Sequence, residues 1–437
     1  MRRGWRLRRA GAKLSDALAI HPARSFRAPR CGPSIPAHSH FRNSLIWGEG
    51  LENVSILGSG RIWGKGLVRS QRAPQPGQRQ VGNKSLVLKQ CRNVVLRDFS
   101  ILMGGWFGIL ATGVDNMTIS NLKIDTNRDG MDIISCRNVR ISDCTVNSPF
   151  DDGICLKSDY SLGFARATEN VTITNCQVSG YDNGTLLDGT FKREHVYANA
   201  GANAGPTGRI KFGTESNGGF KNITISNSVF DYCRGLALET VDGGLLEDVT
   251  ISNVTMRDIV NSPIFLRLGS RLRAPEGTPT GQLRRININN FVVYNADPRY
   301  SSIISGVPGH DIEDVKLSNI RIYYAGGGTK EQAALNPKEE EKTYPEPKMF
   351  GEMPAYGFFV RHVKGIEFND VEVSYLKEDL RPPFRLENVK DVEFNHVKAQ
   401  RAANVPTFLL NGVENFSVQG SAGIPDAKLK SVDRKEF

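Results

Sequence analysis

The chain has 437 residues, 39% of them hydrophobic and 23% charged, which is the composition of a globular protein with ample apolar material for a core. No window approaches the roughly 18 uninterrupted apolar residues that a membrane-spanning helix needs, so we expect no contact with a membrane. Residues 1–40 hold nine lysines and arginines against one acidic residue, so about +8 of the formal net charge of +10 lies in this segment. The rest of the chain is nearly neutral and gives no reason to expect a nucleic-acid partner.

Residues 1–40 are predicted to form a basic tail outside the folded domain. The first twenty, MRRGWRLRRAGAKLSDALAI, begin like a secretory signal, but the apolar stretch is short, contains Asp16 and leads to no small-residue cleavage site. We therefore predict no functional signal peptide. The tail is interpreted as disordered or as the product of a wrongly assigned start, and the folded domain is predicted to span residues 41–437.

A repeated phrase organises the predicted domain. LENVSILGS, VDNMTISNLKI, FKNITISNSVF and VKDVEFNHVKA are four of about a dozen copies, the closest of which lie about 22 to 26 residues apart. Each copy alternates apolar and polar residues, which is the period of a half-buried strand. Short strands bury a continuous apolar face only when copies stack on one another. The repeat therefore predicts an all-β fold, a right-handed parallel β-helix of about a dozen coils.

Four longer gaps interrupt the repeat. They lie at about residues 69–82, 181–206, 269–281 and 325–354 and are rich in glycine, proline or charge, as loops are. Insertions in a solenoid often surround its binding face. We expect these loops to do the same.

Cysteines and asparagines are both assigned structural roles. The seven cysteines include no C-x-x-C pair, so we predict buried thiols rather than a zinc ribbon or a redox dithiol. Most of the N-x-S/T sequences lie inside the repeated phrase, and we interpret their asparagines as turn residues that bond to their counterparts one coil away. These are Asn53, Asn116, Asn170, Asn183, Asn222 and Asn253.

Three aspartates are the candidate catalytic residues. Asp129 precedes a glycine in DTNRDGMD, and about 22 residues later, one predicted coil, Asp151 and Asp152 follow in NSPFDDGICLKSD. Parallel strands stack about 4.8 Å apart, so side chains at the same corner of successive coils lie close together. Repulsion in such a cluster raises the pKa of at least one carboxyl and leaves another ionised. Glycoside hydrolysis requires such a pairing of an acid with a carboxylate.

Two other interpretations of these aspartates stay open. D-G and D-D-G sequences form turns in many proteins. Clustered carboxylates also suit a calcium ion. The one-coil spacing of the two D-G corners is the observation that favours catalysis.

The repeated phrase, the segment LIWGEGLENVSILGSGRIWGKG and the motifs NRDGMD and DDGICLKS together resemble glycoside hydrolase family 28, the polygalacturonase and rhamnogalacturonase family. The resemblance runs from about residue 41 to the C-terminus. It implies a right-handed β-helix, hydrolysis of α-linked galacturonides with inversion, and no metal or other cofactor. By motif, Asp151 resembles the general acid, and Asp129 and Asp152 resemble the residues that hold and activate the attacking water.

Two motifs of this family are missing from their usual places. Members that act on polygalacturonan usually carry G-H-G in the next coil, where Thr207 stands in place of the histidine. They also carry R-x-K one coil further on, which holds the galacturonate carboxylate, and here Ala237 and Glu239 occupy those positions.

Arg209 and Lys211 are predicted to replace the missing carboxylate-binding pair. They flank an isoleucine in a predicted strand, whose period of two sends both cations to one face. On an outer face they would be placed to bind a sugar carboxylate. The alternative is a surface strand whose cations pair with Glu215 or Glu239.

Three further residues complete the predicted substrate-binding set: Lys157, Asn127 of the N-x-D-G motif, and Glu215. His195 lies in the long predicted loop. We interpret it as a solvated residue rather than a substitute for the missing imidazole.

The predicted function is hydrolysis of α-galacturonide-type linkages in a pectic polysaccharide or oligosaccharide, with exo cleavage or a rhamnogalacturonan backbone among the possibilities. Two alternatives stay open: pectate-lyase-like β-elimination with calcium, and a non-catalytic β-helix that binds polysaccharide. The resemblance implies an extracellular or periplasmic location. We expect a monomer that needs no cofactor and whose partner is its pectic substrate.

Overall fold

The structure is a computed structural model that describes residues 6–9, 19–20, 42–67, 83–195 and 205–437. It divides into two compact units: unit 1 comprises residues 1–198 and 205–224, and unit 2 comprises residues 199–204 and 225–437. Within the predicted tail, β1 (Arg6–Arg9) and β2 (Ala19–Ile20) pair antiparallel with β4 and β3. The rest of the tail lies outside the described residues, so the domain boundary at residue 41 stays a prediction.

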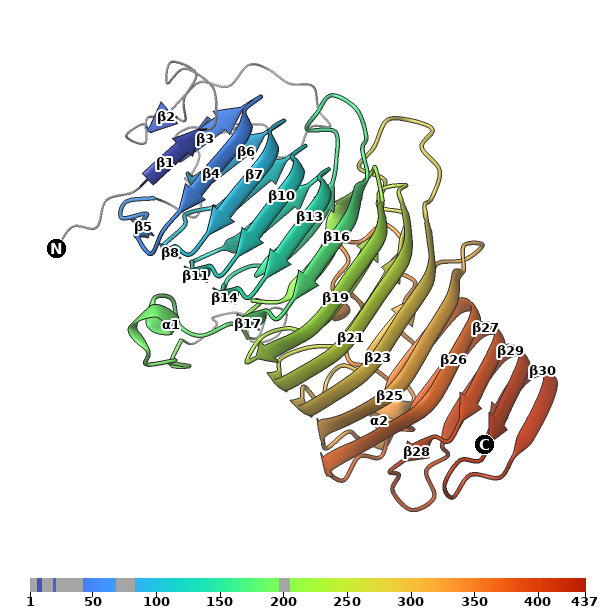
Figure 1. The fold of residues 1–437 in the computed structure, drawn as a ribbon. Helices are drawn as coiled ribbons and strands as arrows, with labels where there is room; N and C mark the ends of the chain where they lie inside the picture. The colour runs from blue at the N-terminus through green and yellow to red at the C-terminus, as the bar shows by residue number, and fades with distance from the viewer. Residues whose placement is uncertain (1–5, 10–18, 21–41, 68–82, 196–204) are drawn as a thin grey trace, which may run out of the picture. The chain divides into compact units, whose positions relative to one another are not determined.

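Unit 1 is a right-handed parallel β-helix in which each coil contributes three short strands (Figure 1). The first sheet contains β3 (Ser44–Glu49), β6 (Lys84–Lys89), β9 (Phe107–Thr112), β12 (Asp129–Ile134), β15 (Ile154–Ser158) and β18 (Ile210–Ser216). The second contains β4 (Glu52–Leu57), β7 (Arg92–Arg97), β10 (Asp115–Ser120), β13 (Arg137–Ser142) and β16 (Thr168–Thr174). The third contains β5 (Arg61–Trp63), β8 (Ser100–Leu102), β11 (Lys123–Asp125), β14 (Thr145–Asn147) and β17 (Gln177–Ser179).

The core of unit 1 is built from aligned apolar columns. One column runs through the first sheet, where each member is the register partner of the next: Leu86, Ile109, Met131, Ile154 and Ile210. All five side chains are fully buried. Complete burial of such a side chain contributes about 1.5–3 kcal/mol. The stacking predicted from the period-2 repeat is therefore confirmed.

The turn role predicted for the asparagines is confirmed for five of the six. In unit 1 the side-chain amides of successive coils bond to one another over 2.7–3.2 Å, in a ladder of Asn53, Asn93, Asn116, Asn138, Asn170 and Asn222. Asn253 belongs to a similar ladder in unit 2. Each of these turns has a positive φ, which asparagine tolerates better than most residues. Asn183 is the exception, because it lies in the predicted loop and its amide contacts the sulfur of Met103.

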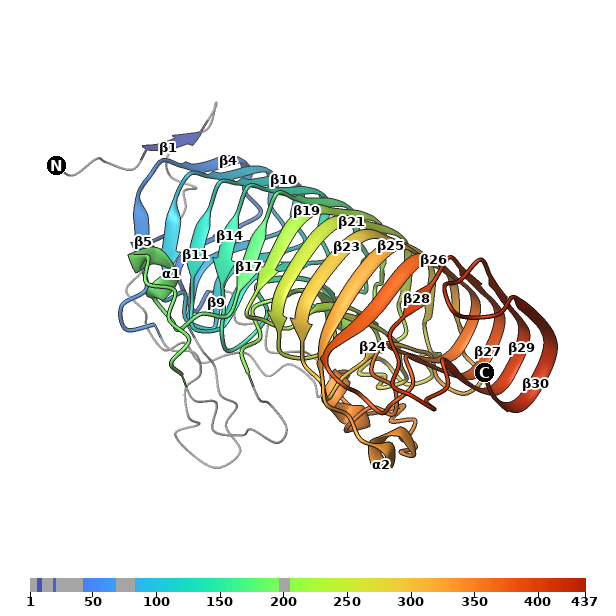
Figure 2. The same ribbon diagram turned by 90° about the horizontal axis from the view of Figure 1, so that it is seen from below.

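The predicted insertion at 181–206 carries the short helix α1 (Thr185–Asp188), seen beside the third sheet in Figure 2. The buried carboxylate of Asp125 holds this helix, since its two oxygens accept from the backbone N–H groups of Gly184 (2.9 Å) and Leu187 (3.0 Å). Residues 196–204 of this insertion, and residues 69–82 of the first predicted one, lie outside the described part of the chain.

Unit 2 is also a parallel β-helix, with longer strands. One sheet contains β20 (Leu236–Thr240), β22 (Ile264–Leu268), β24 (Ser302–Ser305), and the first residues of β26 (Phe358–Lys377), β27 (Phe384–Asn395) and β29 (Phe408–Gln419). The other strands are β21 (Leu245–Ile259), β23 (Gln282–Ala296), β25 (Ile312–Gly326), β28 (Lys398–Ala399) and β30 (Ala427–Glu436), of which β30 pairs antiparallel with β29. The chain passes from unit 1 to unit 2 within β19 (Phe220–Asp231).

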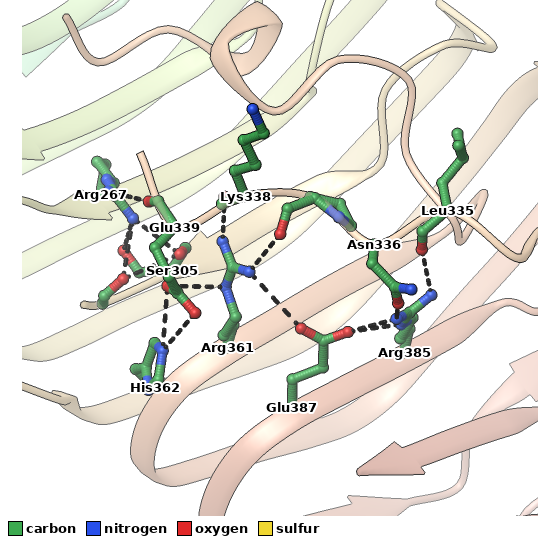
Figure 3. A network of polar contacts seen from close by, with 12 residues as sticks. Arg267, Ser305, Leu335, Asn336, Lys338, Glu339, Arg361, His362, Arg385 and Glu387 are labelled. Atoms are coloured by element: carbon green, nitrogen blue, oxygen red, sulfur yellow. Dashed lines mark hydrogen bonds and ion pairs between the residues drawn. The ribbon is translucent and has the colours of Figure 1, made fainter. Parts of the chain in front are cut away.

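Three arginines of unit 2 hold a predicted insertion by its backbone (Figure 3). Arg267, Arg361 and Arg385 lie on β22, β26 and β27 and donate to the carbonyl oxygens of residues 339, 337 and 335, over 2.9, 2.8 and 2.6 Å. The insertion at 325–354 also contains α2 (Lys330–Ala333) and the 3-10 helix η3 (Pro347–Phe350). The insertion at 269–281 joins β22 to β23.

Six cysteines, Cys91, Cys136, Cys144, Cys155, Cys176 and Cys233, are buried with free thiols, as predicted. Cys31 lies outside the described residues. None of the helices that the structure describes has the length and apolar character needed to cross a membrane.

Candidate active site

The predicted carboxylate cluster forms at the beginning of two neighbouring strands of unit 1. The register of β12 and β15 sets Met131 against Ile154, an offset of 23 residues. Asp152 is therefore the counterpart of Asp129, and Asp151 is the counterpart of Arg128. The predicted pairing of Asp129 with Asp151 across one coil is wrong by one residue, because the offset between these strands is 23 residues rather than about 22.

Close approach of the two coils explains why a glycine follows the carboxylates. A Cβ atom at Gly130 would lie 2.4 Å from the carbonyl oxygen of Gly153, and one at Gly153 would lie 2.9 Å from that of Gly208. Asp129 and Gly130 are the first residues of β12 rather than turn residues. The interpretation of Asp129-Gly130 as a turn is therefore wrong.

Asp129 is buried among charges of both signs. Its Oδ2 lies 3.4 Å from Nζ of Lys157, which also forms an ion pair of 2.6 Å with Asp132. Burial first, and then the negative charges of Asp151 and Asp132, raise the pKa of Asp129 well above its usual value. Asp129 therefore keeps its proton to a higher pH than an ordinary aspartate.

The pKa of Asp151 shifts in the opposite direction, downward. Its Oδ2 accepts from Nε of Arg128 over 2.8 Å, and its side chain is 28% exposed. Burial acts to raise the pKa of Asp151. The charge of Arg128 first, and then interactions with Asp129, Lys157 and Lys211, outweigh it and lower that pKa below its usual range. The surroundings therefore shift the two carboxyls in opposite directions, the pKa of Asp129 upward and that of Asp151 downward.

The raised pKa of Asp129 predicts a specific pH dependence of stability. An aspartate of the unfolded chain loses its proton at about pH 3.9, whereas folded Asp129 still holds it there. Unfolding above this pH therefore releases a proton. The free energy of unfolding is therefore expected to fall as pH rises from about 3.9 to the folded pKa, by at most about 1.4 kcal/mol per pH unit from this group. Asp129→Asn should flatten this slope in urea unfolding followed by circular dichroism.

The matched control for this measurement is Asp143→Asn. Asp143 is an exposed aspartate of the same coil that accepts a hydrogen bond from Asn175. Its substitution should leave the slope as in the unmodified protein. Equal slopes for all three proteins would contradict the raised pKa of Asp129.

Asp152 is held by the two cations that were predicted to bind substrate. Its carboxylate lies 3.0 Å from Nε of Arg209 and 3.5 Å from Nζ of Lys211. Both cationic side chains are buried, with exposures of 0% and 1%. The alternative of a surface strand is wrong, because β18 is buried along almost its whole length. Pairing of these cations with Glu215 or Glu239 stays a prediction. Direct substrate contact by Arg209 and Lys211 stays a prediction.

The other predicted residues differ in how close they lie to the cluster. Lys157 lies inside it, and Glu215 reaches it through an ion pair of 4.0 Å with Lys157. Burial acts to lower the pKa of Lys157, but Asp132 and Asp129 raise it well above its usual value. Asn127 is half-buried and directly precedes Arg128. Contact of Lys157, Asn127 and Glu215 with substrate stays a prediction.

The residues that stand at the positions of the missing motifs, and His195 of the predicted loop, are packed against other parts of the protein. Thr207 is buried and its N–H donates to the carbonyl of Pro149 over 3.0 Å. His195 is exposed, as predicted, and its ring packs edge-on against Phe150 with centroids 5.0 Å apart. The two rings line a cavity of about 310 Å³ together with Pro149, Asp182, Asn183 and Glu194. Ala237 and Glu239 are buried residues of β20 in unit 2.

Three residues of the site were missed from the sequence. Asp132 is a charged residue in the otherwise apolar strand DGMDII, and that contrast is a signal that would have identified it. Arg128 occupies the variable position of N-x-D-G, and Trp106 supports it, with the guanidinium carbon 4.6 Å from the ring centroid. No local pattern marks Arg128 or Trp106, because their contacts come from different coils.

The carboxylates of the cluster are paired with cationic side chains of the protein, an arrangement that fits a bound metal ion poorly. Within the described residues there is no group of three or more histidine, cysteine, aspartate or glutamate side chains placed to hold a metal ion. The aspartates face Arg128, Lys157, Arg209 and Lys211 instead. Such cations compete with calcium for carboxylate oxygens, so this donor set fits calcium poorly.

Residues 36–343 match the model of the glycosyl hydrolases of family 28. The match covers more than half of the chain, and the chain therefore belongs to this family. A probable polygalacturonase from Vitis vinifera is 22% identical over 321 residues, which are 69% of this chain and 59% of that protein. A polygalacturonase from Cochliobolus carbonum is 25% identical over 195 residues, 43% of each chain. The match thus spans less than two thirds of either relative.

One solved structure supports the fold independently of the family match. The family 28 exopolygalacturonase of Yersinia enterocolitica superposes with a TM-score of 0.54 at 16% identity, over 78% of this chain and 60% of its own. At that identity the likeness concerns the fold alone. It agrees with a right-handed parallel β-helix, as predicted from the repeat.

Proposed function

We propose that this protein is a glycosidase that hydrolyses α-galacturonide-type linkages in pectic polysaccharides or oligosaccharides. The observation that carries the proposal is the cluster of Asp129, Asp151 and Asp152 at the start of two neighbouring strands, where the surroundings raise the pKa of Asp129 and lower that of Asp151. Membership of family 28 supports the reaction class. The names of the two relatives, both polygalacturonases, support the substrate class.

Each aspartate has a role in the proposed reaction. Asp151 is the most exposed member of the pair and therefore faces the substrate, where it gives the proton to the glycosidic oxygen as the bond to the sugar carbon breaks. It receives that proton from Asp129, which becomes a carboxylate. Asp129 and Asp152 then hold the attacking water, and Asp152 takes its proton. Transfer of this proton back to the Asp129–Asp151 pair restores the starting state.

The buried cations have positioning roles in this proposal. Arg209 and Lys211 fix both oxygens of Asp152, and Lys157 fixes Asp129 and Asp132. Groups held in this way need little reorganisation when charge moves during the reaction. The finer specificity, exo cleavage or a rhamnogalacturonan backbone, is part of what the experiment decides. A pectic substrate implies action outside the cell, in the periplasm or beyond it.

Reducing-end release is the experiment that tests the proposal. Polygalacturonan and rhamnogalacturonan oligosaccharides are incubated with the protein, and new reducing ends and ultraviolet absorbance are followed in the same tubes, with and without a chelator. Hydrolysis predicts new reducing ends without a gain in absorbance and no effect of the chelator. Release of single sugars from the chain end would identify exo cleavage, and a mixture of lengths endo cleavage.

Two other outcomes would contradict the proposal. A gain in ultraviolet absorbance that the chelator abolishes would indicate β-elimination with calcium. Saturable binding of either saccharide without new reducing ends would indicate a polysaccharide-binding β-helix.

A further inference from the structure

Arg128 occupies an unusual place beside the proposed general acid. Its Nε donates to Asp151 over 2.8 Å and lies 3.9 Å from Oδ1 of Asp129. The guanidinium also packs over the ring of Trp106, with its carbon 4.6 Å from the centroid. A cation over the face of tryptophan is attracted by the electrons of the ring, so this contact fixes the orientation of the guanidinium.

Arg128 is the cation of the cluster that a ligand can reach. Its side chain is 24% exposed, whereas Lys157, Arg209 and Lys211 are 9%, 0% and 1% exposed. Against the described residues, the only side-chain hydrogen bond of Arg128 is the one from Nε. The two Nη groups therefore offer donors beside Asp151, in the planar arrangement that matches a carboxylate.

We propose, resting on the proposed function, that Arg128 selects acidic sugars. Its Nη groups bind the carboxylate of a uronate residue. This contact draws the guanidinium away from Asp151, so that Asp151 can take the proton of Asp129. The proton transfer breaks the O–H bond of Asp129 and forms that of Asp151. No other reactant is needed. A sugar without a charged carboxylate does not compete for the guanidinium and leaves Asp151 ionised.

This inference explains how the site manages without the usual carboxylate-binding pair. Positions Ala237 and Glu239 carry no cation, and Arg209 and Lys211 are buried against Asp152. Arg128 is left as the least buried cation of the cluster. The simpler interpretation is that Arg128 only neutralises Asp151 in the folded protein, and it predicts no link to the charge of the substrate.

The test compares matched oligogalacturonides, with free carboxylates and with the same carboxylates methyl-esterified. For each, kcat/KM is measured over a range of pH and binding is measured by calorimetry, with the unmodified protein, Arg128→Gln and Arg128→Lys. Arg42→Gln is the matched control, since Arg42 likewise pairs with a carboxylate, that of Glu49, and lies over a tryptophan, Trp47.

We expect Arg128→Gln to lose about tenfold to a hundredfold in kcat/KM and in affinity on the free acid, and much less on the ester, because one charge-assisted contact is lost. Removing a cation also raises the pKa of nearby carboxyls. The alkaline limb of the profile, where the aspartate pair loses its proton, should therefore move to higher pH. Arg128→Lys keeps the charge without the planar guanidinium, so its kcat/KM on the free acid should lie between the values of the unmodified protein and Arg128→Gln. Arg42→Gln should behave like the unmodified protein.

Equal losses on the acid and the ester, with an unchanged pH profile, would overturn the inference and leave Arg128 a purely structural residue. Failure of the proposed function would look different, because the unmodified protein would release no reducing ends from either substrate. In that case the calorimetry still decides about Arg128. Weaker binding of the acid alone by Arg128→Gln supports carboxylate recognition, and equal binding overturns it.

Discussion

Asp151→Asn is expected to lower turnover about a hundredfold to about ten-thousandfold, the range that a general acid contributes. An asparagine cannot accept the proton of Asp129 and pass it to the leaving oxygen. The fold should persist, since the Asp151 side chain is 28% exposed and an asparagine keeps an oxygen that accepts from the N–H of Asp152, so that the ion pair with Arg128 is the main loss. A partly exposed ion pair contributes about 1 kcal/mol or less to stability. Turnover is measured as reducing-end release, and folding by circular dichroism of the same samples.

Asp143→Asn serves as the control for this prediction too, because Asp143 is an exposed aspartate of the same coil, away from the carboxylate cluster. It should retain normal turnover. If Asp151→Asn also retains normal turnover, the assignment of Asp151 as the acid is wrong. If it is inactive and unfolded, Asp151→Glu, which keeps a carboxylate charge beside Arg128 but displaces the carboxyl, becomes the informative variant.

Asp379→Asn is expected to destabilise unit 2 by about 3–5 kcal/mol, the cost of removing one partner of a buried ion pair. Both oxygens of Asp379 face Arg381, over 2.9 and 2.7 Å, and the two side chains are 0% and 1% exposed. One of those oxygens also accepts from the N–H of Gly328 over 3.0 Å. Arg381 in turn donates to the carbonyls of Met353 and Pro298. Loss of the carboxylate charge would leave a buried guanidinium without compensation.

Urea unfolding followed by circular dichroism is the measurement for Asp379→Asn. Tryptophan fluorescence is unsuitable, because the tryptophans among the described residues, Trp47, Trp63 and Trp106, lie in unit 1. Asp391→Asn is the control, since Asp391 is exposed and its turn keeps an acceptor for Asn415. A loss below about 1 kcal/mol for Asp379→Asn, no more than an exposed pair contributes, would show that the buried pair adds little to stability.

The site also shows how a family motif can be kept while its surroundings change. The order of the three aspartates follows the family pattern, whereas cations occupy positions around them that no motif describes. Arg128, Arg209 and Lys211 each contact one of those aspartates. Substrate preference and the pH dependence of activity are therefore expected to depend on these three cations as much as on the aspartates.

The sequence by itself determined the β-helix, the asparagine ladders and the gathering of Asp129, Asp151 and Asp152 at one place. These follow from local patterns: the period of two defines strands, the turn residues define corners, and a near-constant spacing brings the corners of successive coils together. The buried cysteines could be predicted for the same reason, since they lie within or beside the repeated phrase.

Only the tertiary structure decided which side chains face one another and which carry a proton. A one-residue difference in register made Asp152 the counterpart of Asp129 and placed Arg128 against Asp151. Burial turned Arg209 and Lys211 from predicted surface residues into partners of Asp152. The distribution of protons depends on desolvation and on charges contributed by several coils at once, and neither quantity is a property of any local stretch of sequence.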